Sequence, residues 1–421
     1  MICLMPMCAY LSETSRMIQI YKALKAAGAQ ARIATHGGVH EALLQSEGID
    51  YDIVGPRMDA ARGWQFVMSN VGIGNPDQSM YAPDEMRTYV LAERDYFQKH
   101  GVTAVVTGFT LTALLSTRLA GIPLVVEHAG AFLPPLFERN LPPMASRPPP
   151  GPLGYMPRGL ARWLQNKMVP KLKLYLAGFN ALATELGVTP IPSFPALILG
   201  DLVLVTEAPE VYGVGEAEMQ NWRPTDGAYW PSTRFAYTGP LFAEFDLPVP
   251  SNVEQALRAT GPHVYVALTS VPAGTVRQVV RGVAASGASV IVAATVHELA
   301  DLAGPRVTVS GVLPSHKIMP RVDLAVTTAG QGSLQCAMAS GVPVIGIPLH
   351  LEQDSNIHFL VQRGAARALP VARIDDTKLA GMVTGMLARP KYRAAARTIQ
   401  AAYARRNGPA LCASAILAHL G

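Results

Sequence analysis

Residues 327–333 read Thr-Thr-Ala-Gly-Gln-Gly-Ser, and they join a run typical of a buried strand to a run typical of a short helix. Val322 to Thr327 is apolar and β-branched, whereas residues 333–339 have a helical pattern that a glycine ends soon afterwards. A strand, a glycine turn and a helix N-terminus bring unpaired backbone N–H groups to one point. The segment therefore predicts a site where a diphosphate can bind.

Four residues of this turn are candidate phosphate contacts. Gly330 and Gly332 let a phosphate approach the backbone because they carry no side chain. The hydroxyl groups of Thr328 and Ser333 can each donate a hydrogen bond to it. An ordinary Rossmann-type strand–helix turn is the alternative interpretation of the same residues.

The following segment supplies groups that suit a sugar. Residues 341–343 read Gly-Val-Pro, and residues 348–356 read Pro-Leu-His-Leu-Glu-Gln-Asp-Ser-Asn. The carboxylate of Glu352 and the amide of Gln353 can accept and donate hydrogen bonds to vicinal hydroxyl groups. Asn356 follows by about one helical turn, so it can reach the phosphate or ribose side of the same pocket. Together these residues predict a nucleotide-sugar site.

Residues 327–356 resemble the donor signature of family 1 glycosyltransferases, the macrolide and UDP-sugar type. That signature runs His-Gly-Gly-x-Gly-Ser, then Gly-Val-Pro, then Pro-x-x-x-Asp-Gln-x-x-Asn, and its spacing matches throughout. Thr328 stands in place of the family's phosphate-binding histidine, Ala329 in place of its first glycine, and Glu352 in place of its usual aspartate. The resemblance implies an α/β protein with the GT-B fold, in which two Rossmann-like domains face each other across a cleft.

Two halves with alternating strand and helix patterns agree with that fold class. We predict an N-terminal acceptor-binding domain over residues 1–245, a Pro-rich linker over 246–253, and a C-terminal nucleotide-sugar-binding domain over 254–421. In the first half we expect a long loop between a strand ending near Val54 and a helix starting near Pro83. The resemblance implies that the last helix, about residues 400–420, packs back on the N-terminal domain.

Two further candidate donor contacts depend on partial matches to the family pattern. Ser270 follows the first strand of the second half, where relatives often carry Leu-Gly-Ser, but a serine can also simply end a strand. Val312 stands where the family has an aromatic residue that stacks on the base. Only backbone pairing from Leu313 then remains as a contact to the base.

The residue at the position of the general base differs from the family pattern. In that pattern a histidine after the first strand deprotonates the acceptor hydroxyl. Alignment on residues 24–28 places Glu13 at that position. A glutamate can be the base if burial raises its pKa, or it can simply favour the dipole at a helix start. His128, at the carboxyl end of a predicted strand, is the alternative base. His36 is interpreted as part of a strand–helix turn on the acceptor side.

The chain has 421 residues, 49% of them hydrophobic and 15% charged, which is long enough and apolar enough for two globular domains. Its four cysteines have no metal-ligand spacing and no Asp-x-Asp motif occurs, so we expect no metal site. No apolar run predicts a membrane-spanning helix, and Met1 to Leu11 suits a buried strand better than a signal peptide. We expect a cytoplasmic protein that needs no cofactor, because the nucleotide sugar is a co-substrate, and that binds no nucleic acid.

The segment from Tyr155 to Leu176 carries five Lys and Arg residues and no acidic residue, and the whole chain has a formal net charge of +5. Interleaved with Leu160, Trp163 and Leu164, these cations can contact an anionic membrane surface, as in glycosyltransferases with lipid acceptors. That interpretation predicts peripheral binding to the inner face of the membrane. A solvated helix face in the acceptor domain is the other interpretation.

The sequence thus predicts an inverting, metal-independent glycosyltransferase. It would move a sugar from a UDP- or dTDP-sugar to a hydroxyl group of a hydrophobic small molecule or lipid. One alternative is an epimerase or hydrolase with the same fold that acts on the nucleotide sugar itself. Another is a catalytically silent nucleotide-sugar-binding partner protein, because both histidines of the family pattern are replaced.

Overall fold

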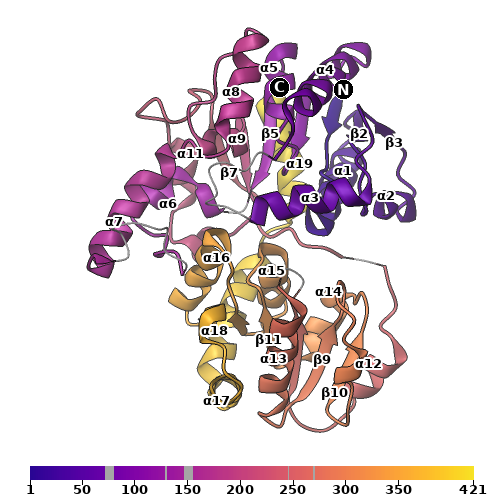
Figure 1. Ribbon diagram of the computed structural model, residues 1–421, viewed down its shortest axis with the longest axis vertical. Coiled ribbons are helices and arrows are strands. Elements are labelled where there is room, and N and C mark those ends of the chain that lie inside the picture. Colours follow the sequence, from indigo (N-terminus) through magenta and orange to yellow (C-terminus); the bar gives the residue numbers. More distant parts are fainter. Residues whose placement is uncertain (72–79, 129, 147–154, 245, 269–270) are drawn as a thin grey trace. The chain divides into compact units, whose positions relative to one another are not determined.

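The computed structural model describes residues 1–71, 80–128, 130–146, 155–244, 246–268 and 271–421. The chain divides into two compact units, and each contains its own sheet (Figure 1). The first unit comprises residues 1–141, 156–241 and 406–421, and the second comprises residues 142–155 and 242–405. Among the described residues, no helix combines the length and the apolar character needed to cross a membrane.

The first unit is built on a parallel sheet of seven strands in the order β3-β2-β1-β4-β5-β6-β7. The strand order reverses between β1 and β4, and open α/β sheets bind ligands at the carboxyl ends of the strands near such a point. The strands are β1 (Ile2–Leu4), β2 (Ala31–Thr35), β3 (Tyr51–Ile53), β4 (Ala104–Thr107), β5 (Leu124–His128), β6 (Leu202–Val205) and β7 (Arg234–Tyr237).

Helices follow most of these strands, as right-handed crossovers between parallel strands require. The longer ones are α1 (Leu11–Ala26), α3 (Ala60–Val71), α4 (Pro83–Lys99), α5 (Ala113–Ala120), α7 (Arg158–Met168), α8 (Leu176–Glu185) and α19 (Gly408–Leu420). The shorter ones are α2 (Ala42–Ser46), α6 (Pro134–Glu138), α9 (Phe194–Ile198), α10 (Pro209–Tyr212) and α11 (Glu216–Asn221). The helix α3 occupies part of the segment where the sequence predicted only a long loop.

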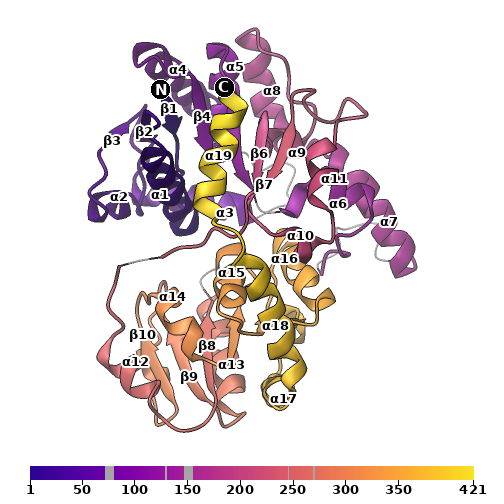
Figure 2. The same ribbon diagram turned by 180° about the vertical axis from the view of Figure 1, so that it is seen from behind.

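The C-terminal helix α19 belongs to the first unit, although α18 (Pro390–Tyr403) before it belongs to the second. It packs against α1 and β6, and Figure 2 shows it beside α1 in front of the sheet. Its buried Cys412 and Ile416 join the same apolar core as Met17 and Ile20 of α1. Removal of these apolar side chains from water is the main force that holds the helix there.

The second unit contains a parallel sheet of six strands in the order β10-β9-β8-β11-β12-β13. Its strands are β8 (His263–Ala267), β9 (Ser289–Ala293), β10 (Val307–Ser310), β11 (Leu324–Thr327), β12 (Val344–Gly346) and β13 (Ala366–Ala368). Its helices are α12 (Ser251–Ala256), α13 (Ala273–Ala284), α14 (Ser315–Ile318), α15 (Gln331–Ala339), α16 (Leu351–Gln362), α17 (Asp376–Leu387) and α18.

The core of the second unit lies between the sheet and the packed pair α13 and α17. Valine dominates it: Val264, Val266, Val290 and Val326 from the strands are all almost completely buried. Strands of a parallel sheet that is covered on both faces are expected to be apolar and β-branched throughout. This rigid sheet holds the loops at its carboxyl edge, where the candidate donor residues lie.

Candidate functional site

The two halves of the donor signature meet at the carboxyl edge of the second sheet. Strand β11 ends at Thr327 and leads through a turn into α15, whereas β12 leads through a loop into α16. The two strands are parallel neighbours, so both connections leave the sheet at the same edge. Asn356 of α16 joins them directly, because its Nδ2 donates to the carbonyl of Ala329 at 3.3 Å and to Oε1 of Glu352 at 3.0 Å.

The turn before α15 leaves bare backbone exposed. Gly330 has an ordinary φ of −65°, and neither Gly330 nor Gly332 has a positive φ. A Cβ added at either position would meet nothing within 4 Å. Gly330, the residue before α15, has no side chain to cap the N-terminus of the helix. The protein's own packing does not explain the two glycines, but an anion lying against this backbone would.

The residue in the left-handed conformation is Ala329, with φ of 62°. Its N–H donates to Oγ1 of Thr327 at 3.0 Å, and its side chain is completely buried. Thr328 is also nearly buried, at 6% exposed, whereas Ser333 is partly exposed. An alanine here keeps the tight turn that the family forms with glycine, at the cost of backbone strain of about 1–2 kcal/mol.

The predicted sugar-binding pair occupies the start of α16. Glu352 is about one-third exposed, and Nδ1 of His350 lies 3.9 Å from its Oε2. Gln353 is buried, and its Oε1 accepts a hydrogen bond from the N–H of Leu349 at 2.9 Å. Among the described residues, Oε2 of Glu352 accepts no hydrogen bond and has only this longer contact with His350, so it is the more accessible acceptor of the pair. Both printed hydrogen bonds of Asn356 Nδ2 stay within the protein, and the predicted contact of Asn356 with a phosphate or ribose stays a prediction.

The remaining donor candidates lie in other loops. Leu313 is buried, at 4% exposed, between β10 and α14. Because β10 is the edge strand, β9 and β8 separate it from β11, although all of these strands end at the same edge. Val312 beside it is half-exposed and offers an apolar surface. Ser270 lies outside the described residues.

Glu13 lies in the first turn of α1, and its side chain is buried, at 2% exposed. Its Oε1 accepts hydrogen bonds from the backbone N–H groups of Met7, Gly108 and Phe109 at 3.1, 3.1 and 2.7 Å. Its Oε2 is buried and has no hydrogen-bond partner among the described residues. Burial raises the pKa of this carboxyl to about 7, although the backbone N–H groups and the charge of Arg16 act in the opposite direction.

His128 ends β5, and its buried Nε2 has no hydrogen-bond partner in the described parts of the chain. Burial lowers the pKa of the imidazole to about 3, and the positive charge of Arg16 adds to the effect. Arg16 itself forms an ion pair with the buried Glu127, in which Nε lies 2.8 Å from Oε2. Thr206 donates to the other oxygen of Glu127 at 2.8 Å. Since β1, β4 and β5 are neighbours, Glu13 and His128 lie at the same edge of the first sheet.

Comparison with known proteins identifies the family. Residues 277–418 match the family model described as "Erythromycin biosynthesis protein CIII-like, C-terminal domain". A PGL/p-HBAD biosynthesis glycosyltransferase of Mycobacterium tuberculosis is 26% identical over 327 residues, which cover 77% of this chain and 72% of the relative. A PGL/p-HBAD biosynthesis rhamnosyltransferase of Mycobacterium bovis is also 26% identical, over 79% of this chain and 71% of the relative.

Solved structures with the same fold include spinosyn forosaminyltransferase SpnP, with a TM-score of 0.68, 15% identity and coverage of 100% of this chain and 99% of that chain. Glycosyltransferase VinC, solved in complex with dTDP, has a TM-score of 0.66, 16% identity and coverage of 100% and 98%. These comparisons support the predicted family, the family 1 glycosyltransferases of the macrolide type, with the family model matching the C-terminal third of the chain. The predicted GT-B fold is confirmed.

The glycosyltransferase also contains a buried histidine that the sequence analysis assigned to the acceptor side. His36 is only 2% exposed, and its Nε2 lies 2.8 Å from Oε1 of the buried Glu93. Its ring stacks on Tyr89 with centroids 3.9 Å apart, and Thr112 and Ser116 donate to the same carboxylate. In this conformation the ring points into the core of the first unit rather than toward a ligand.

Sequence reasoning passed over Asp354, which lies between Gln353 and Asn356. Its Oδ2 accepts hydrogen bonds from the N–H and the hydroxyl of Ser146 at 2.8 and 2.9 Å. Burial raises the pKa of Asp354 above its ordinary value. The carboxylate thus attaches the segment 142–146 to α16, beside the donor residues. The acidic residue was visible in the motif, but its partner is 208 positions away.

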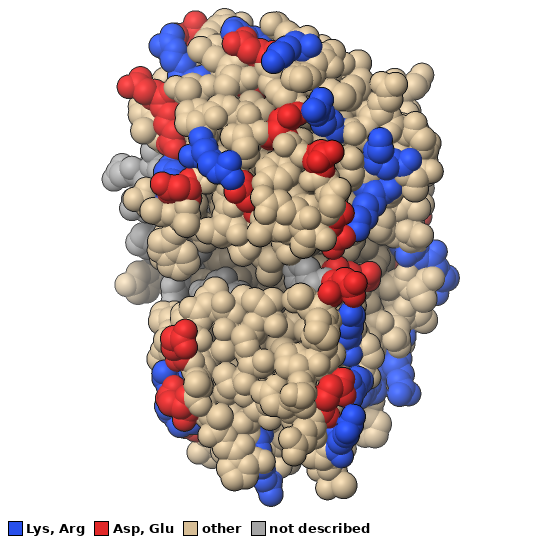
Figure 3. All heavy atoms as spheres, turned by 90° about the vertical axis from the view of Figure 1, so that its right-hand side faces the viewer, with Lys and Arg blue, Asp and Glu red and all other residues tan. Residues whose placement is uncertain are grey.

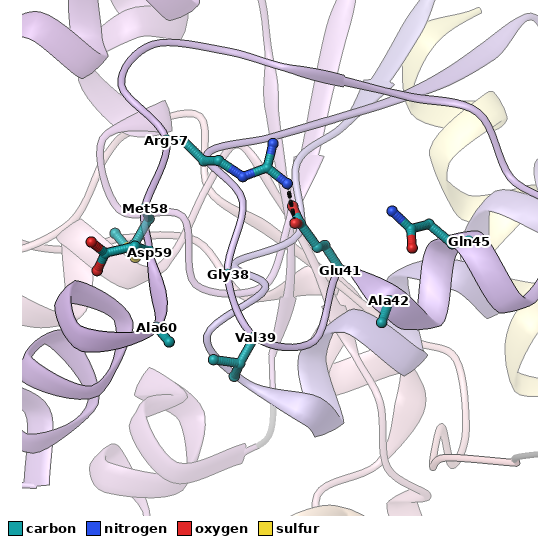
Figure 4. Close-up of a pocket in the computed structure, with 9 residues that line it drawn as sticks. All are labelled: Gly38, Val39, Glu41, Ala42, Gln45, Arg57, Met58, Asp59 and Ala60. Carbon is teal, nitrogen blue, oxygen red and sulfur yellow. Dashed lines mark hydrogen bonds and ion pairs between the residues drawn. The ribbon is translucent and has the colours of Figure 1, made fainter.

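The first unit of the glycosyltransferase also has an open cavity of about 310 Å³ beyond the carboxyl ends of β2 and β3. Figure 4 shows its lining, in which Arg57 and Glu41 form an ion pair and Val39 and Ala60 offer apolar surface. Such a mixture suits a molecule that carries both polar groups and apolar parts. Among the described residues, no cluster of three or more His, Cys, Asp or Glu side chains has an arrangement that would hold a metal ion.

Proposed function

We propose that this glycosyltransferase moves a sugar from a UDP- or dTDP-sugar, with inversion and without a metal ion, to a hydroxyl group of a hydrophobic molecule or lipid. The donor part of this proposal is supported by the turn at Gly330 and Gly332, which has open space beside both glycines. Asn356 connects this turn to Glu352 through hydrogen bonds to Ala329 and Glu352. A dTDP donor agrees with the neighbour VinC, whose structure contains that nucleotide. A lipid or natural-product acceptor agrees with the names of the relatives.

The donor binds with its diphosphate against the first turn of α15. Bare N–H groups and the positive end of the helix dipole stabilise the negative charge, and the hydroxyls of Thr328 and Ser333 add hydrogen bonds. The free oxygen of Glu352 accepts from a sugar hydroxyl. As the bond from the anomeric carbon to the diphosphate breaks, its electron pair passes to the diphosphate oxygen. The same N–H groups then stabilise the leaving group, which is the task that a metal ion performs in other enzymes.

Glu13 takes the acceptor proton. The acceptor oxygen attacks the anomeric carbon on the side opposite the diphosphate, so the new bond forms with inversion, and the hydroxyl proton moves to Oε2 of Glu13. In the part of the chain that the structure describes, that oxygen has no hydrogen-bond partner, whereas Oε1 accepts from three N–H groups. A pKa near 7 allows the carboxylate to exist at neutral pH and still to accept a proton.

Donor binding is tested by thermal shift with UDP-, dTDP- and GDP-sugars, because a ligand of the folded state raises the melting temperature. Ser333→Ala is expected to weaken nucleoside diphosphate and nucleotide sugar alike by about 0.5–1.5 kcal/mol. Ser340→Ala, at the other end of α15, is the matched control and leaves both affinities unchanged. If no nucleotide sugar raises the melting temperature of the wild type, the donor assignment is wrong.

The metal-free mechanism is tested with a chelator. Transfer to a verified acceptor is expected to continue at the same rate when EDTA is present during preparation and assay. Loss of transfer that a divalent cation restores would refute this part of the proposal.

A catalytically silent nucleotide-sugar-binding protein is the second candidate. The hydrogen bonds at Glu13 Oε1 favour this candidate. A carboxylate with a purely structural role would also accept hydrogen bonds from three loop N–H groups. A protein that binds a donor in the thermal-shift assay but transfers its sugar to no member of a broad panel of phenols, polyketides and lipids would support this candidate instead.

A further inference from the structure

The helix α7 has its polar side turned inward and its apolar side turned outward. Its buried residues are Ala161, Gln165 and Asn166, and the amide of Asn166 donates to Oδ1 of Asn140 at 2.6 Å. Its exposed residues include Leu160, Trp163 and Met168, at 51%, 49% and 46%. A surface helix of a globular protein normally buries its apolar side. Among the described residues, the outward side of α7 therefore lacks the apolar partner that such residues usually have.

The spacing of residues along α7 places two of its exposed apolar residues and one lysine on neighbouring turns of one face. Leu160, Trp163 and Lys167 are separated by three and four residues, so their side chains lie one above another. Lys167 is exposed and has a long aliphatic stem that can lie along the apolar residues while the ammonium group extends beyond them. Both views of the ribbon place α7 at the outer edge of the first unit, away from β1, β2 and β3 (Figures 1 and 2).

The charges around this face are positive and mostly unpaired. Arg158, Lys167 and Lys173 have no ion-pair partner among the residues that the structure describes, and Lys171 pairs with Asp226 at 3.4 Å. Residues 155–176 contain no acidic residue. Elsewhere the two signs are mixed, as on the face of the molecule drawn in Figure 3. Exposed Trp and Leu beside unpaired Lys and Arg form the combination that favours the boundary between lipid headgroups and acyl chains.

We propose that α7 docks this glycosyltransferase on the surface of membranes that contain anionic lipids. Leu160, Trp163 and Met168 enter the boundary between headgroups and acyl chains, and the unpaired cations contact lipid phosphates. With 11 residues, α7 is too short to span a bilayer and lies in the plane of the interface. A second copy of the chain is disfavoured as the partner, because two such faces would bring their cations together.

The purpose of the docking rests on the proposed function, since a lipid acceptor would be reached from the membrane surface. The docking itself does not depend on sugar transfer and is measured without a donor. Vesicles of equal parts phosphatidylglycerol and phosphatidylcholine are mixed with the full-length protein and sedimented. The protein is expected to sediment with them at low salt and to be released as salt is added, because salt screens exposed charges. Vesicles of phosphatidylcholine alone should bind much less.

Two variants of α7 test the face, and each has a matched control elsewhere in the first unit. Lys167→Gln is expected to weaken vesicle binding about fivefold, the effect of one cation near an anionic surface. Trp163→Ser is expected to weaken it roughly tenfold or more, because a large apolar group no longer enters the lipid. The controls are Lys25→Gln at the end of α1 and Trp64→Ser on α3, both exposed, and neither should change the binding.

The absence of sedimentation with anionic vesicles at low salt would overturn the proposal. So would equal binding by the Trp163→Ser and Trp64→Ser proteins. If the wild type instead forms a concentration-dependent dimer that Trp163→Ser abolishes, the face is an interface between copies and the proposal is wrong. Transfer to a water-soluble acceptor without vesicles should be the same for Lys167→Gln and the wild type. Vesicle binding by a protein that transfers no sugar would support the docking and refute the proposed function.

Discussion

Replacement of Glu13 by glutamine tests both the buried environment and the catalytic role of this residue. The glutamine Oε1 can keep the three backbone hydrogen bonds that Glu13 Oε1 accepts, and its amide nitrogen takes the place of the unpartnered Oε2. The variant therefore removes the titrating proton with little change in shape. Glu13→Ala would be a poorer test because it leaves three buried N–H groups without a partner.

The magnitude follows from the raised pKa. The carboxyl has a pKa of about 7 in the folded protein and an ordinary value of 4.5. A raised pKa contributes stability that is fully present below pH 4.5 and is lost as the pH rises through 7, because only the folded state retains the proton in that window. Each pKa unit corresponds to 1.36 kcal/mol, so the wild type loses about 3 kcal/mol that the glutamine variant does not lose.

Tryptophan fluorescence makes the measurement specific. The chain has four tryptophans, and Trp64, Trp163, Trp222 and Trp230 all belong to the first unit, which contains Glu13. Urea unfolding followed by this signal is measured at pH 5 and pH 8 for both proteins. The variant should gain about 3 kcal/mol relative to the wild type between the two pH values. An equal difference in stability at both pH values would show that the carboxyl does not carry the raised pKa.

The rate of transfer distinguishes a base from a structural carboxylate. If Glu13 is the base, Glu13→Gln should slow transfer by roughly 10² to 10⁴ fold with donor affinity unchanged, and the wild-type rate should rise with pH up to about 7. His128→Ala should then have a small effect, because an imidazole with a pKa of about 3 is a weak base. Full activity of Glu13→Gln with a verified acceptor would refute the catalytic role.

Three further outcomes are expected. Ala329→Gly should raise the free energy of unfolding of the second unit by about 0.5–1 kcal/mol. Glycine removes the backbone strain at φ of 62°, and the greater entropy of the unfolded chain offsets only part of that gain. Denaturation monitored by circular dichroism measures the change, and a loss of stability would contradict the prediction. Glu352→Ala should weaken nucleotide sugar by about 1–3 kcal/mol and leave nucleoside diphosphate nearly unchanged in titration calorimetry; equal losses would remove the sugar assignment. His36→Ala should destabilise the first unit by about 3–5 kcal/mol, because the buried Glu93 loses its histidine partner and keeps only the hydroxyl donors Thr112 and Ser116. A change below about 1 kcal/mol in urea unfolding would mean that the pair contributes little.

The regular elements show where the amino-acid pattern was sufficient. Strands such as β8 and β11 were predicted correctly because short runs of apolar, β-branched residues between turn residues are typical of buried strands. The helix α3 was missed and the segment was expected to be a loop. The apolar pattern of α3 was nevertheless present, because Ala60, Trp64, Val67, Met68 and Val71 recur at the spacing of one helical face. In the fold that face is not the buried one, since Trp64 and Met68 are exposed whereas Gly63 and Phe66 are buried.

The sequence by itself predicted the fold and a candidate donor segment, because the signature lies within 30 consecutive residues whose spacing indicates a strand, a turn and a helix. Tertiary structure alone decided the environment of the chemical groups. Glu13 accepts hydrogen bonds from residues 95 and 96 positions away, and its burial among such distant residues raises the pKa of the carboxyl although those N–H groups act in the opposite direction. Likewise, only the packed structure shows that α7 buries its polar side. A pKa or an exposed surface depends on neighbours brought together by folding, and these do not appear in any local stretch of sequence.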